Sequence, residues 1–129
     1  MSKLIVLLAA VAALAALAVA TGASAKGGGT AVVKSGSCSG NATWKLKVKP
    51  DDGALETEFQ VDQNVAGRAW RVVIRQNGVE RFRGVKTTKS PSGSFTVRRL
   101  LADKRGADHI VAKARALATG QTCRGKVTL

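Results

Sequence analysis

The stretch ATWKLKVKPDDGALETEFQVD, residues 42–62, decides the fold class. Residues 42–49 alternate Trp, Leu and Val with three lysines, and residues 54–62 alternate Leu, Thr, Phe and Val with Glu, Gln and Asp. Strict two-residue alternation is typical of a strand with one buried and one solvated face. The intervening Pro-Asp-Asp-Gly, residues 50–53, has the composition of a turn. The stretch therefore predicts an antiparallel hairpin.

A four-residue turn would pair residue 49 with residue 54 and so set the whole register of this hairpin. Trp44 then lies opposite Phe59, and Lys47 lies opposite Glu56. Because apolar residues face apolar ones and opposite charges face each other, the register is supported by the side chains it pairs. We expect the acids of the hairpin to form cross-strand ion pairs rather than a catalytic carboxylate pair or a calcium loop.

A second hairpin is predicted around Asn77-Gly78, in the stretch IRQNGVERFRG at residues 74–84. Asn-Gly favours a two-residue turn, which pairs residue 76 with 79 and places Phe82 opposite Val73. The same register sets Arg81 and Arg83 against the buried face of residues 69–76. Two arginines cannot both cover an apolar core, so we expect residues 79–86 to be an edge strand or the register to slip.

The C-terminal third continues the alternation in residues 93–101, 108–117 and 121–129. The Ala-rich run at 108–117 would also suit a helix, but its strict alternation and the Thr119-Gly120 turn favour a hairpin. Seven short strands predict an all-β, two-sheet antiparallel sandwich. We place residues 42–49, 54–62 and 93–99 in one sheet and the other four strands in the second.

The closing half, SFTVRRLLADKRGADHIVAKARALATGQTCRGKVTL, resembles the last three strands of fibronectin type III and bacterial immunoglobulin-like domains. The shared pattern is D-x-I-x-A-x-A, beginning at Asp108, followed by the Thr119-Gly120 turn and a final strand. The chain is also similar to small secreted proteins of actinobacteria. It has no Tyr, although the family carries a signature Tyr, so the resemblance implies the fold and assigns no functional residue.

The first 25 residues have the pattern of a secretory signal peptide. A single Lys3 precedes an uncharged apolar run through Ala20, and the small-residue triplet at 23–25 predicts cleavage after Ala25. An uncleaved membrane anchor is the alternative. Residues 26–41, rich in Gly and Ser, are expected to be a flexible lead-in, and residues 42–129 to be the sandwich. Cleavage would take the basic residues from 21 to 20 against 8 acids, and the net charge from +13 to +12.

Two cysteines, Cys38 and Cys123, follow the leader. In an oxidising compartment outside the cell membrane they can form a single intramolecular disulfide, which we expect. Free or intermolecular thiols are the alternative. A metal site of the two cysteines and His109 is disfavoured because no closely spaced ligand pair exists. We predict no cofactor, and His109 is interpreted as a solvated surface residue.

The predicted sheets distribute charge unequally. The outer face of the first sheet carries nearly balanced charges, whereas that of the second is strongly cationic, with Glu80 as its one acid. The candidate binding residues for an anionic partner are Arg71, Arg75, Lys113, Arg115, Arg124 and Lys126. Val73, Phe82 and Val111 would form an apolar patch among them. A surface that only keeps the protein soluble is the simpler interpretation of the same charge.

The leading hypothesis is a non-catalytic secreted binding module, located outside the cell or at the cell wall, that docks on anionic envelope polymers or an acidic protein surface. The alternative is a secreted inhibitor or effector that binds one protein through the loops at 62–68 or 86–93. We do not expect nucleic acid as a partner, because the few aromatic residues are needed in the core and export argues against it. No catalytic signature is present, so we do not expect an enzyme.

Overall fold

The computed structural model describes residues 29–129, and in this range the chain forms eight strands and no helix, hence none that could cross a membrane. The strands are β1 (Val32–Ser37), β2 (Thr43–Asp51), β3 (Ala54–Asp62), β4 (Ala69–Gln76), β5 (Val79–Thr87), β6 (Ser94–Ala102), β7 (His109–Ala116) and β8 (Thr122–Thr128). The predicted signal peptide, residues 1–25, lies outside the described residues.

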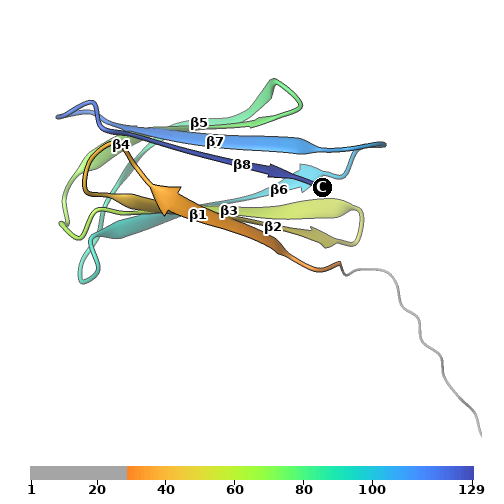
Figure 1. The fold of residues 1–129 in the computed structure, drawn as a ribbon, viewed down its shortest axis with the longest axis horizontal. Helices are drawn as coiled ribbons and strands as arrows, with labels where there is room; N and C mark the ends of the chain where they lie inside the picture. Colours follow the sequence, from red (N-terminus) through yellow and green to blue (C-terminus); the bar gives the residue numbers. More distant parts are fainter. Residues whose placement is uncertain (1–28) are drawn as a thin grey trace, which may run out of the picture.

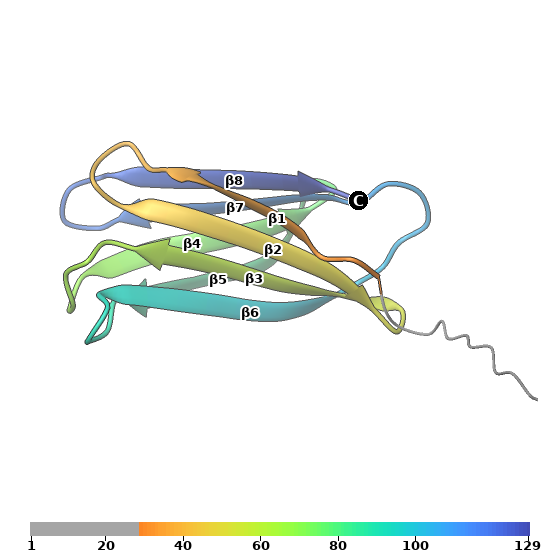
Figure 2. The same cartoon turned by 60° about the horizontal axis from the view of Figure 1, so that its bottom comes forward.

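Two antiparallel sheets of four strands are stacked as two layers (Figure 1). Their strand orders are β1-β2-β3-β6 and β5-β4-β7-β8. The predicted all-β sandwich, and the predicted division of the strands between the sheets, are confirmed. The arrangement is compatible with an immunoglobulin or fibronectin type III fold, and β4-β7-β8 follow the order of the C, F and G strands. The connections between strands differ from that fold, because β3 follows β2 within the same sheet (Figure 2).

Strand β1 was not expected, since residues 26–41 were predicted to be a flexible lead-in. In the structure β1 pairs with β2 from Val32 opposite Val48 to Ser37 opposite Thr43. Its Gly and Ser residues have low β-propensity, so no local pattern marks the strand. It forms because β2 offers an unpaired edge and a disulfide holds the end of the segment at Cys38.

The β2–β3 hairpin has a different turn from the predicted one. Asp51 pairs with Ala54, so the turn contains two residues, Asp52 and Gly53. Both have positive φ, 54° and 82°, which is the type I′ geometry that matches the twist of a hairpin. The predicted register was therefore wrong by two residues: Lys47 faces Glu58 rather than Glu56, and Phe59 faces Leu46 rather than Trp44. A shift of two preserves the buried and solvated faces, which is why the predicted core was still correct.

The β4–β5 hairpin shows the expected slip. Gln76 pairs with Val79 and Arg75 with Glu80. The next residue of β4, Ile74, pairs with Phe82, so Arg81 is the extra residue of a bulge in β5 and the rest of the register is shifted. Phe82 thereby lies opposite Ile74 and packs partly buried against the core, not opposite Val73 on the outer face. The bulge resolves the conflict between the arginines and the core, because it turns Phe82 inward. β5 is also an edge strand, as predicted.

One aromatic side chain lies at each open side of the sandwich. Trp44 fills the side between β1 and β8, where a Cβ atom on Gly36 would come within 3.0 Å of the indole and one on Gly125 within 2.5 Å. On the opposite side Phe82 of β5 lies under the guanidinium of Arg99 from β6, with 4.5 Å between the guanidinium carbon and the ring centroid. The core between them is a single cluster that includes the fully buried Trp70.

The predicted disulfide between Cys38 and Cys123 is present. It joins the β1–β2 turn to β8 and so connects the two sheets covalently. The same turn is hydrogen-bonded to the start of β8, because the Ser39 amide donates to the carbonyl of Thr122 and the Thr122 amide donates to Ser39 Oγ. A disulfide is consistent with an oxidising compartment.

Candidate functional site

The outer face of the β5-β4-β7-β8 sheet concentrates positive charge. Alternation sends every second side chain of β4, β7 and β8 to solvent, and the buried residues between them form the core. The structure brings all six predicted cations onto this surface, and the slipped register of β5 adds a seventh, Arg83 opposite Val73. We call this surface the basic face. Its cations are Arg71, Arg75, Arg83, Lys113, Arg115, Arg124 and Lys126.

Like charges lie directly opposite each other on the basic face. Arg71 of β4 pairs with Arg115 of β7, and Lys113 of β7 pairs with Arg124 of β8. Directly opposed like charges destabilise a sheet. Two such pairs on neighbouring rows therefore cost folding stability when no anion is bound.

The β1-β2-β3-β6 sheet pairs its charges in the opposite way. Lys47 lies opposite Glu58 and Lys49 opposite Glu56. Arg98 of β6 lies opposite Glu58 on its other side, with 3.6 Å between Nε and the carboxylate. Opposite charges thus face each other across the strands of one sheet, whereas like charges face each other at two positions of the other. The opposition of like charges is specific to the basic face, so a general excess of Lys and Arg does not explain it.

Glu80 is the acid of the basic face, and it is bound by arginines. Arg83 donates to the Glu80 carboxylate through Nε at 3.0 Å and Nη2 at 2.7 Å, and Arg75 Nη2 lies 3.9 Å away. Hydrogen bonding to Arg83 lowers the pKa of Glu80 below its usual 4.5, and Glu80 in turn raises the pKa of Arg83. Within residues 29–129, the other five cations have no carboxylate within 4.0 Å.

A shallow hollow of about 370 Å³ lies at the centre of the basic face. Val73 is half-buried at its floor, and cations of β4, β7 and β8 surround it. Val111 is half-buried one row further along, between Arg75 and Lys126. Two residues of the predicted apolar patch therefore lie on the basic face, whereas Phe82 lies on the inner side of β5.

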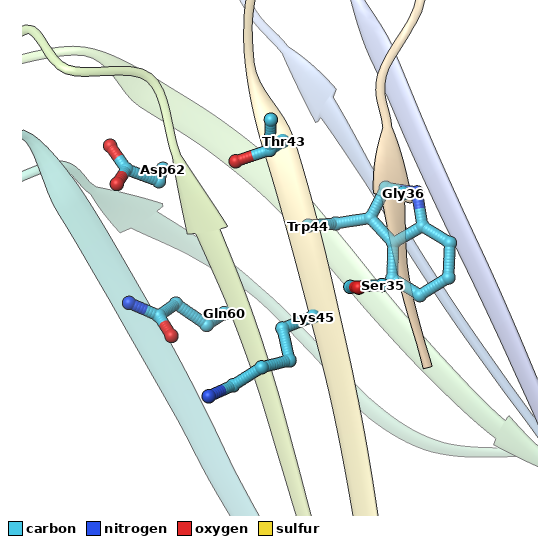
Figure 3. Close-up of a pocket in the computed structure, with 7 residues that line it drawn as sticks. All are labelled: Ser35, Gly36, Thr43, Trp44, Lys45, Gln60 and Asp62. Atoms are coloured by element: carbon cyan, nitrogen blue, oxygen red, sulfur yellow. The ribbon is translucent and has the colours of Figure 1, made fainter. Parts of the chain in front are cut away.

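A second hollow, on the β1-β2-β3-β6 sheet, has a mixed lining. Figure 3 shows the side chains of Lys45, Gln60 and Asp62 on one side of β2 and the indole ring of Trp44 on the other, over Gly36. Lys45 lies opposite Gln60 and Thr43 opposite Asp62, so one cation and one anion share the hollow. This balance gives it no preference for either sign of charge.

The two loops of the alternative hypothesis form one hydrogen-bonded unit. Thr88 Oγ1 donates to the Val65 carbonyl at 2.7 Å and accepts from the Arg68 amide at 2.9 Å. Gly93, with φ of 74°, accepts from the amides of Gln63 and Asn64, and a Cβ atom there would collide with the backbone of residues 64 and 65. The loops at 62–68 and 86–93 are therefore held together at one end of the sandwich.

The buried aspartate and the histidine of the described residues form hydrogen bonds within the fold. Asp108 is buried and accepts hydrogen bonds from Gln76 Nε2, Asn77 Nδ2 and the Lys104 amide, which fixes the β6–β7 loop. His109 is exposed, as predicted, and its Nδ1 lies 3.1 Å from Thr128 Oγ1. In the described part of the chain, no three His, Cys, Asp or Glu residues cluster as metal ligands would.

No protein-family model matches the chain, and no curated protein or solved structure matches it.

Proposed function

We propose that this protein is a small, secreted, non-catalytic binding module that docks its basic face on an anionic partner, either an envelope polymer or an acidic protein. The observation that carries the proposal is the pair of like-charged cross-strand contacts, Arg71 with Arg115 and Lys113 with Arg124. These contacts oppose folding in the free protein, and a bound polyanion would turn both into favourable interactions. We also propose that the protein is a bacterial fibronectin type III or immunoglobulin-like domain of the small actinobacterial kind.

The test compares two variants with equal net charge. In the first, four arginines of the basic face become Gln: Arg71, Arg75, Arg115 and Arg124. In the second, four cations of the other sheet become Gln: Lys45, Lys47, Lys49 and Arg98. Both lose four positive charges, so any difference in binding reports position rather than total charge.

The measurement is the affinity for a soluble polyanion as a function of salt concentration. On a flexible anionic chain each neutralised charge contributes about 0.7 to the slope of log affinity against log salt, so the basic-face variant should lose about 2.8 from the slope. The control variant should lose much less. Equal slopes for the two variants would refute the proposal, because the affinity would then depend on the net charge of the protein and not on the position of the cations.

The second candidate function is a secreted inhibitor or effector that binds one protein through the joined loops at 62–68 and 86–93. The hydrogen bonds of Thr88 favour it, since they preorganise the loops. Val65 is 45% exposed there. This function predicts that the protein captures one stoichiometric partner from culture supernatant and that the complex persists at moderate salt. The Val65→Ser variant should lose this binding, and the Arg→Gln variant of the basic face should retain it.

A further inference from the structure

Arginine predominates on one outer face of this domain and lysine on the other. The basic face carries five arginines and two lysines. The outer face of the other sheet carries three lysines, at positions 45, 47 and 49, and one arginine, Arg98. Lysine is sufficient where a point charge must pair with a neighbouring carboxylate, whereas the planar guanidinium binds oxyanions through two parallel hydrogen bonds. This distribution of arginine and lysine indicates that the basic face recognises oxyanion geometry as well as charge.

The cations of the basic face form an oblique track. The Arg71–Arg115 pair spans β4 and β7, and the Lys113–Arg124 pair spans β7 and β8 one row further along. Adjacent strands are about 4.8 Å apart and successive outward residues about 6.7 Å apart, so the two pairs step diagonally across the sheet. A linear chain of anions can follow such a track, with one charge at each step.

The surroundings of the track are aliphatic and hydroxylic. Val73 and Val111 lie between the cations, and Thr122 lies in the row of Arg71 and Arg115. Methylene groups of a bound chain would contact the valines, and hydroxyl groups could hydrogen-bond to Thr122. These are the groups that a polyol presents between its phosphates.

All five aromatic residues of the chain are directed away from the basic face. Phe59, Trp70 and Phe95 are buried, and Trp44 and Phe82 pack partly buried against the core. Proteins that bind single-stranded nucleic acid stack bases on aromatic side chains, which supplies about 1–3 kcal/mol per base. The basic face offers no such platform, so a polymer without rings suits it better than a nucleic acid.

Resting on the function proposed above, we infer that the partner of the basic face is a linear poly(polyol phosphate), whose phosphodiesters bind the arginines in succession along the oblique track. The probe is poly(glycerol phosphate) of defined length, compared with polyglutamate of equal charge and with an oligothymidylate of equal phosphate number. Titrations at one salt concentration give the three affinities. Poly(glycerol phosphate) should bind at least about tenfold tighter than polyglutamate, because its glyceryl units also contact Val73, Val111 and Thr122. Oligothymidylate should bind no tighter than poly(glycerol phosphate).

A charge-conserving variant tests the arginine geometry. Arg71, Arg115 and Arg124 are replaced by Lys, and the matched control replaces Arg68, Arg98 and Arg105 by Lys. The first triple variant should bind poly(glycerol phosphate) about tenfold more weakly at unchanged net charge, and the control should bind as the native protein does. Equal affinities for these two variants would show that only charge matters and would overturn the inference.

The probes separate failure of this inference from failure of the proposed function. If the affinity for polyglutamate is within about tenfold of that for the phosphate polymer, the basic face does not select a polyol phosphate. The inference is then overturned while the basic face remains a binding site. If oligothymidylate binds tighter than poly(glycerol phosphate), the partner is a nucleic acid and the inference is likewise overturned. If the Arg→Gln variant of the basic face binds every probe as the native protein does, both fail.

Discussion

Removing the disulfide, by Cys38→Ser together with Cys123→Ser, is expected to lower the free energy of unfolding by about 4.6 kcal/mol. The two cysteines are 85 residues apart in sequence. In the chain-entropy model a closed loop of that length costs the unfolded ensemble about 15 cal/mol/K, which is about 4.6 kcal/mol at 25 °C. A domain of this size has about 5–15 kcal/mol of stability in total, so the bridge supplies a large share of it.

The variant should still fold, because the bridged segment has other contacts with β8. The hydrogen bonds between Ser39 and Thr122 remain, and the Ala42 amide still donates to Gln121 Oε1 at 2.8 Å. Urea unfolding followed by tryptophan fluorescence measures the loss. With a slope of about 1.5 kcal/mol per molar urea, the midpoint should fall by about 3 M.

Reductant provides the control. Reduced native protein should unfold at the same midpoint as the double variant, and reductant should leave the double variant unchanged. A midpoint shift below about 0.5 M, at unchanged slope, would refute the reasoning, since the loop entropy would then contribute little to the stability.

Three further outcomes are expected. Gly125→Ala should destabilise the domain by about 1–3 kcal/mol, because the new methyl group meets the Trp44 indole, and Trp44→Leu should recover part of that loss in a double-mutant cycle of urea midpoints. Asp108→Ala should cost about 3 kcal/mol, measured in the same way, since it leaves buried donors such as Gln76 Nε2 without a partner. Glu80→Gln should strengthen polyanion binding at neutral pH. Because Arg83 lowers the pKa of Glu80, the carboxylate stays charged down to a pH below 4.5, and only there should titrations of the native and variant proteins give the same affinity.

Most of the sandwich was predictable because its strands alternate strictly. The side chains of β2, β3, β4 and β7 were assigned to the correct faces, and a register error of two residues in the β2–β3 hairpin did not move any of them. The error arises because Pro50 and Asp51 are assigned to the predicted turn, whereas the positive φ angles of Asp52 and Gly53 allow the strands to continue to the tip. Alternation reports the face of a residue, and the turn conformation decides its partner.

Part of the candidate site could not be found in this way. Arg83 was predicted to oppose the core, and the bulge in β5 moved it to the basic face while turning Phe82 inward. The bulge buries an aromatic ring and solvates a guanidinium at the same time, and the gain from burying the ring exists only once the second sheet covers that face. The opposition of Arg71 and Arg115 could not be predicted either, because β4 and β7 are joined through the other sheet and no turn between them indicates their register.

The sequence by itself determined most of the buried side chains, which cysteines pair and where positive charge would gather, because these properties depend on local periodicity and composition. The tertiary structure alone decided that Gly- and Ser-rich residues 32–37 form an edge strand, that Phe82 belongs to the core, and that Arg71 faces Arg115. Each of these depends on a partner strand distant in the chain, and such pairing is set by the free energy of the assembled sheets rather than by the pattern of either strand.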